Sequence, residues 1–158
     1  MNASIAEAIR AVERCIEELY NQAVEISDGY LSFVDGVESK NKGWGSRSNL
    51  QLSCTKKGNH LDIRRVGIKW YGPKNKRTSL RYSLKKHPEK QSYASDQFKP
   101  YAKEWELEKV VETEKSLALI RRKNKHLVRS IMSIRAAAKI DTANPTDDAS
   151  EEMDSTEG

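Results

Sequence analysis

The stretch NLQLSCTKKGNHLDIRRVGIKWYGPKNKRTSLRYSLK, residues 49–85, determines the fold. Three runs within it alternate apolar with polar side chains, as β-strands with one buried face do. These runs are residues 49–56, 60–71 and 77–85. Lys57-Gly58-Asn59 and the Gly-Pro-Lys-Asn-Lys of 72–76 separate them and are rich in turn-forming residues. The stretch therefore predicts a three-stranded antiparallel β-meander.

The second run changes the parity of its apolar positions halfway along. Ile63 has one parity, whereas Ile68 and Trp70 have the other. Because successive side chains of a strand point to opposite faces, we expect a β-bulge at Arg64-Arg65 that restores a single apolar face. Trp70 is then a core residue, and Trp105 is assigned to the core as well.

Cations occupy the other face of this predicted sheet. Arg77, Arg81 and Lys85 alternate with apolar residues in the third run, and we expect Lys69 and Tyr71 to project from the same face. A β-ribbon with such a face can lie in a DNA groove, where Arg binds guanine or phosphate and Lys acts as a point charge. The alternative is a solvated face whose charges prevent aggregation of an edge strand.

Long helices are predicted on both sides of the meander. Residues 4–27 carry one apolar stripe, start at a capping box of Ser4 and Glu7, and stop at Asp28-Gly29. A second helix spans about 101–138. The fold class is thus α+β, with a long N-terminal helix, a three-stranded antiparallel β-meander and a long C-terminal helix.

The second helix has a stripe with alternating spacings of three and four residues. Its members are Val110, Thr113, Leu117, Ile120, Asn124, Leu127, Ile131 and Ile134. One interpretation is that the stripe packs on the first helix and the sheet, with Asn124 bound to a backbone group. The other is a homodimer seam of Leu117, Ile120, Asn124, Leu127 and Ile131, in which the asparagine fixes the register of a coiled coil.

Charge is strongly segregated along the chain. Residues 40–90 hold fifteen Lys and Arg against only Asp62 and Glu89, which predicts a polyanionic partner, most commonly nucleic acid. The C-terminal residues are acidic and almost without apolar side chains, which favours disorder. We expect one domain at 1–139 and a disordered acidic tail at 140–158.

Double-stranded DNA is the predicted partner of the basic block. The hairpin tip and the loop at 36–48, whose Trp44 is flanked by glycines and cations, extend the basic sheet face. Trp44 is equally well explained as a loop anchor tucked under the domain. The candidate nucleic-acid-binding residues are Lys69, Tyr71, Lys74, Lys76, Arg77, Arg81, Lys85, Lys42, Trp44 and Arg47.

Other classes of function find little support in the sequence. The three histidines are scattered, and no phosphate-binding loop or paired carboxylates accompany the basic block, so we expect no enzyme, no metal site and no cofactor. No apolar run is long enough to span a membrane, and the N-terminus does not resemble a signal peptide. Cys15 and Cys54 are expected to be buried free thiols, which indicates a reducing, cytoplasmic location.

The order of elements, with Tyr-Ala-Lys-Glu-Trp-Glu at 101–106 and Ser-Leu-Ala-Leu-Ile-Arg-Arg at 116–122, resembles the MobI-type conjugative-transfer proteins over roughly residues 10–135. These are auxiliary mobilisation factors of integrative conjugative elements and related plasmids. The resemblance implies a protein that acts at the origin of transfer and helps a relaxase, or another transfer protein, to start DNA processing without cutting DNA itself. It carries over no catalytic residues.

A second class of function remains open. A coiled-coil interaction module or regulator would use the stripe of the second helix for assembly and the basic block to bind RNA or an acidic protein. Asn124 discriminates between the two, because its loss changes the oligomeric state only if the stripe is an assembly surface.

Overall fold

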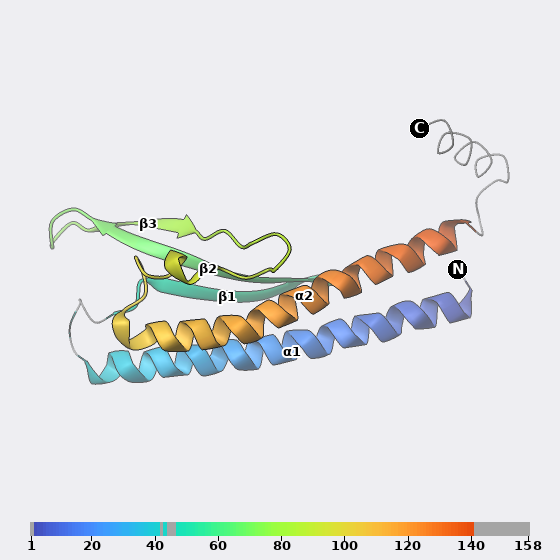
Figure 1. Ribbon diagram of the computed structural model, residues 1–158, viewed down its shortest axis with the longest axis horizontal. Helices are drawn as coiled ribbons and strands as arrows, with labels where there is room; N and C mark the ends of the chain where they lie inside the picture. Colours follow the sequence, from blue (N-terminus) through green and yellow to red (C-terminus); the bar gives the residue numbers. More distant parts are fainter. Residues whose placement is uncertain (1, 42, 44–46, 141–158) are drawn as a thin grey trace, which may run out of the picture.

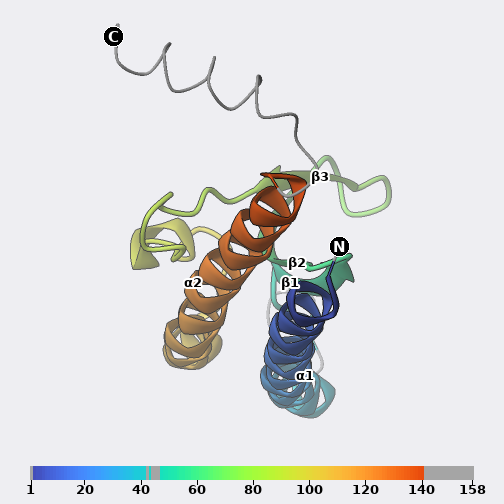
Figure 2. The same cartoon turned by 90° about the vertical axis from the view of Figure 1, so that its right-hand side faces the viewer.

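The structure, a computed structural model, describes residues 2–41, 43 and 47–140. Its elements are α1 (Ala3–Lys40), β1 (Leu50–Lys57), β2 (His60–Tyr71), β3 (Thr78–Ser83), the short 3-10 helix η2 (Ser95–Gln97) and α2 (Glu104–Ile140). The two long helices lie side by side along the sheet, which has the order β1-β2-β3 (Figures 1 and 2). The predicted α+β architecture is confirmed, whereas the predicted tail lies outside the described residues apart from Ile140.

Helix α1 is longer at both ends than expected. Its N-cap is Asn2, whose Oδ1 accepts a hydrogen bond from the Ile5 N–H at 2.8 Å, so the predicted cap at Ser4 is not used. The helix continues through Gly29 because its buried stripe continues, with Tyr30 only 1% exposed. A glycine inside a helix costs about 1 kcal/mol relative to alanine, and burial of the tyrosine offsets it. In the described part of the chain, neither helix is long and apolar enough to cross a bilayer.

The apolar stripes of both helices meet the inner face of the sheet in two clusters. The larger cluster contains Ile9, Ile16, Leu19, Ala23, Leu61, Ile63, Leu117, Ile120 and Ile131. The smaller contains Tyr30, Leu50, Tyr93, Phe98, Tyr101 and Val110, near the start of α2. The stripe predicted for residues 4–27 is thereby confirmed. Trp105 is only half-buried, with its ring centroid 6.1 Å from that of Phe33.

The strands pair in continuous register, without the bulge predicted at Arg64-Arg65. Strand β1 pairs with β2 from Leu50 opposite Gly67 to the turn, and β2 pairs with β3 from Val66 to Tyr71. Strand parity is therefore constant, and Arg65 points to the helices while Trp70 points away from them. The prediction failed because it assumed that the apolar residues of both parities face the core, whereas Ile68 and Trp70 share the parity of the outward face.

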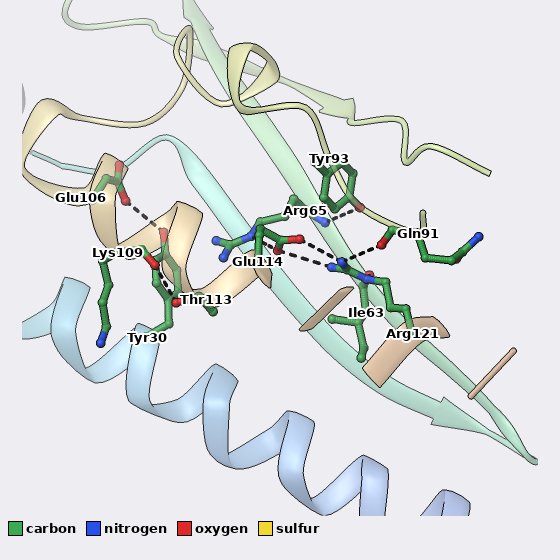
Figure 3. A network of polar contacts seen from close by, with 10 residues as sticks. All are labelled: Tyr30, Ile63, Arg65, Gln91, Tyr93, Glu106, Lys109, Thr113, Glu114 and Arg121. Carbon is green, nitrogen blue, oxygen red and sulfur yellow. Dashed lines mark hydrogen bonds and ion pairs between the residues drawn. The ribbon is translucent and has the colours of Figure 1, made fainter. Parts of the chain in front are cut away.

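Arg65 is fully buried and takes part in a network of polar contacts (Figure 3). Its Nε donates to Oε1 of Glu114 at 2.8 Å, and Nη1 of Arg121 donates to Oε2 of the same carboxylate at 2.8 Å. Nη1 and Nη2 of Arg65 have no hydrogen-bond partner in the described residues, but the guanidinium lies 4.4 Å from the Tyr30 ring centroid. The aromatic face compensates part of the cost of burying this charge.

Strand β3 is shorter than β2 and leaves backbone groups along part of one edge of β2 without strand partners. Side chains from α2 and from the segment before it form hydrogen bonds with these groups. Asn124 accepts a hydrogen bond from the Leu61 N–H at 3.1 Å and donates to the Asn59 carbonyl at 3.0 Å. Arg121 donates to the Ile63 carbonyl, and the Arg65 N–H donates to the Tyr93 hydroxyl. These contacts satisfy backbone groups that would otherwise be buried without partners.

The stripe of α2 that was considered as a possible homodimer seam is buried within the single chain. Leu117, Ile120, Asn124 and Ile131 are all less than 5% exposed within a single chain, and Leu127 packs against the same core. The stripe faces α1 and the sheet, as the intramolecular interpretation required.

Candidate nucleic-acid interface

The hairpin of β2 and β3 extends beyond the third strand of the sheet. Because β1 starts opposite Gly67, residues 68–71 of β2 pair with β3 and not with β1. The hairpin tip lies at the same end of the molecule as the end of α1 and the start of α2 (Figure 1). Gly72 begins the tip with φ +95°, a conformation that L side chains rarely adopt, and a Cβ there would lie 2.8 Å from the Lys76 carbonyl oxygen. The sequence thus builds a tight, projecting turn.

A groove of about 1080 Å³ lies between this hairpin and the segment that leads into α2. Its described lining residues are Asn49, Ile68, Lys69, Trp70, Tyr71, Lys74, Arg77, Pro100 and Lys103. Four of them are cations and none is an acid. Lys69, Lys74 and Lys103 make no ion pair with any residue that the structure describes. The groove therefore favours an anionic ligand.

Two aromatic side chains stand in the same groove. Trp70 is 38% exposed, and its Nε1 donates to Oδ1 of Asn49 at 3.2 Å. Tyr71 is 47% exposed, and its hydroxyl lies 3.2 Å from that of Tyr82; this hydrogen bond is the main cause that raises the pKa of Tyr82. The polar atom of each ring therefore already has a hydrogen-bond partner, although both side chains remain partly exposed.

The predicted basic face is divided between the two sides of the sheet. Lys69 pairs with Leu80 on the helix side, where its Nζ lies 5.5 Å from the Tyr82 ring centroid and 5.9 Å from that of Tyr101. Arg81 pairs with Ile68 on the outward side and hydrogen-bonds Gln51 there. The expectation that Lys69 and Tyr71 share a face with Arg81 is wrong, because the missing bulge leaves their parity opposite.

The other predicted residues lie around the groove or outside the described residues. Lys76 is exposed in the hairpin tip, and Lys85 is exposed after β3, where its backbone bonds the Gln97 side chain at 3.1 and 2.9 Å. Arg47 is exposed in the loop before β1. Lys42 and Trp44 fall outside the residues that the structure describes. The hairpin thus brings Lys69, Tyr71, Lys74 and Arg77 together in one groove.

Asp62, the one acid in the three strands, does not neutralise the cations of the groove. Asp62 is hydrogen-bonded by Arg64, with Nε to Oδ1 at 3.1 Å, and this bond lowers the pKa of Asp62 below its ordinary range. The carboxylate is therefore ionised and already paired at neutral pH.

Trp70 and Lys103 line the groove but were missed as candidates. The indole was assigned to the core through the assumed bulge, and Lys103 is followed by Glu104 and Glu106, so no cluster of cations marked it. If the side chains from Leu61 to Tyr71 are taken to alternate without a bulge, Arg65 is buried and Trp70 lies on the outward face.

The cysteines also differ from expectation. Cys15 is exposed and Cys54 is half-buried, and both are free thiols. Burial raises the pKa of the Cys54 thiol, which keeps it protonated and unreactive at neutral pH.

The two sequence segments behind the family resemblance serve the scaffold. In the first, the Tyr101 ring covers Gly67, where a Cβ would meet it at 2.5 Å, and Glu106 accepts hydrogen bonds from Tyr30 and Ser48. In the second, Arg121 completes the edge of β2. These segments therefore position the hairpin, while the hairpin itself supplies the exposed cations.

One comparison with known proteins identifies a family for this chain. The family model described as MobI, MobI protein, matches residues 19–135, which include both segments and the whole hairpin. Neither the curated proteins nor the solved structures that were searched contain a match. The matched region covers most of the 158-residue chain, and the chain belongs to the MobI family.

Proposed function

We propose that the chain is a non-catalytic, DNA-binding accessory factor that acts at an origin of transfer and assists a relaxase in initiating conjugation. The MobI family supports the mobilisation role. The observation that supports DNA binding is the hairpin, where Lys69, Lys74, Lys76, Arg77, Arg81 and Lys85 are all exposed and no acid occurs between Asp62 and Glu89. We further propose that the protein acts in the cytoplasm, where element DNA is accessible and its two thiols stay reduced.

In this proposal the body of the protein presents the hairpin and does no chemistry. The register and the buried network hold β2, and β2 carries the tip. The tip and the sheet edge contact the phosphates of the duplex. The relaxase, rather than this chain, would cut the DNA.

The test measures binding of the full chain to two duplexes of equal length, one random and one from the origin of transfer of its element, over a range of salt concentrations. A steep decrease of affinity with salt, of about 0.9 log units per log unit of salt for each phosphate contacted, and tighter binding to the origin duplex are expected. No binding to either duplex would refute the proposal.

Charge-removal variants assign the binding to the hairpin. The double variant Lys74→Ala/Lys76→Ala should reduce the salt slope by about 1.8, because two phosphate contacts are lost. Arg10→Ala/Arg14→Ala is the matched control: it removes two exposed cations from the N-terminal part of α1 and should leave the slope unchanged. This part of the helix lies towards the end of the molecule opposite the hairpin tip (Figure 1). Equal effects of both changes would show that net charge alone drives binding.

A further inference from the structure

We propose that the hairpin groove binds an unpaired stretch of DNA, with one base stacked on Trp70 and the adjacent phosphates held by the lining cations. The inference rests on the proposed DNA-binding function and specifies the form of DNA that this groove accepts.

The first argument is the position of the exposed apolar surface. Of the eight large hydrophobic side chains exposed in the described part of the chain, four belong to the β2–β3 hairpin. These are Trp70, Tyr71, Leu80 and Tyr82. A ribbon that only contacts duplex phosphates gains nothing from exposed rings, because the base faces of a duplex are covered by their neighbours in the stack. An unpaired base, in contrast, offers its face to an aromatic side chain.

The second argument is the orientation of Trp70. The Nε1–H is already used by Asn49, so the indole is held in place through its polar edge. Its ring is therefore positioned before a ligand arrives, which reduces the ordering cost of binding. An aromatic ring that is held in place and partly exposed is the arrangement that base stacking needs.

The third argument is the combination of size and charge. The groove, at about 1080 Å³, has the volume of a site for a small ligand, so it can take one or a few nucleotides but not a double helix. Lys69, Lys74 and Lys103 come from both of its sides, from β2, from the tip and from the residue before α2. A single strand that enters the groove would thus have cations on either side of its phosphates.

The test compares a fluorescein-labelled oligodeoxythymidylate of about 12 nucleotides with a duplex of equal length, both at one salt concentration. The Trp70→Leu variant of the full chain should weaken binding of the single strand by about tenfold, while duplex binding changes by less than about twofold. Trp70→Phe, which keeps an aromatic face but loses the bond to Asn49, should recover single-strand binding to within about threefold.

Leu80→Ala is the matched control, because Leu80 is the most exposed apolar residue of the same hairpin, at 52%, and does not line the groove. It should change neither affinity. If Trp70→Leu does not fold, as judged by circular dichroism, Tyr71→Leu gives the same comparison at the second ring of the groove.

The outcomes separate this inference from the proposed function. Duplex binding without single-strand binding, or equal effects of Trp70→Leu on both ligands, would overturn the unpaired-strand site and leave the accessory role intact. Failure to bind either ligand would overturn both.

Discussion

Replacement of Asn124 by leucine tests how α2 completes the sheet. The side chain is 3% exposed and joins α2 to two backbone groups of the β1–β2 turn and β2. Leucine cannot make either bond. The Leu61 N–H would then be buried without a partner, whereas the Asn59 carbonyl, which is only partly buried, would retain some access to water.

The two losses set the expected magnitude. A buried donor without a partner costs about 1–3 kcal/mol, and loss of the second, partly solvated bond costs about 1 kcal/mol. Burial of the leucine methyl groups returns part of this, so we expect the free energy of unfolding to fall by about 2–3 kcal/mol. For a chain of this size that corresponds to a decrease in Tm of roughly 5–10 °C.

The assay is urea denaturation followed by circular dichroism, with sedimentation velocity on the same samples. The matched control is Lys123→Ala, an exposed neighbour on the same helix, which should change stability by less than about 0.5 kcal/mol. Unchanged stability of Asn124→Leu would refute the role of this side chain as an edge partner. A change in oligomeric state would show that α2 is an assembly surface after all.

Three further predictions concern the buried interior. Glu114→Gln leaves two buried arginines without their shared carboxylate and should cost about 3–5 kcal/mol in urea denaturation; a loss below about 1 kcal/mol would contradict the network. Gly67→Ala should destabilise by about 1–3 kcal/mol, because its Cβ would overlap an aromatic ring. Gly36→Ala, near the C-terminal end of α1 and with nothing within 4 Å of the added Cβ, should stabilise by about 0.5–1 kcal/mol. Equal effects of the two glycine substitutions would show that backbone freedom, and not ring contact, decides. Burial is the main cause that raises the pKa of Tyr30 above its ordinary value of 10.0. The stabilising contribution of the protonated phenol is therefore complete below pH 10 and is lost as the pH rises towards the folded-state pKa. The free energy of unfolding, measured from pH 9 upward, should fall more steeply for the parent than for Tyr30→Phe, and parallel curves would refute this.

Periodicity predicted the scaffold well. The stripes of both long helices and the order of three antiparallel strands follow from the spacing of apolar residues alone. Asn124 was foreseen as a residue that bonds a backbone group, although the pattern alone could not exclude a dimer. Helix ends were less predictable, because the burial of Tyr30 keeps α1 helical through a glycine that local rules treat as a stop.

The sequence predicted the positive charge of the candidate site but not the arrangement of its side chains. Composition identified the cations of the hairpin, since their excess over acids is visible without coordinates. Their division between two faces depends on whether Arg65 is inside or outside, and that depends on Glu114, forty-nine positions later in the chain. A local pattern has no access to such a partner, so Trp70 was placed on the wrong side.

Strand β2 joins the hairpin to the body of the protein, whereas the hairpin tip contributes little to the core. Under the proposed function, substitutions at the tip would therefore alter DNA recognition without loss of stability, and substitutions in the body would alter stability without loss of the recognition residues. Proteins with this division can diverge quickly in target while they remain similar in shape. For the accessory factor proposed above, such separate tuning would let one scaffold follow a changing DNA sequence at the origin of transfer.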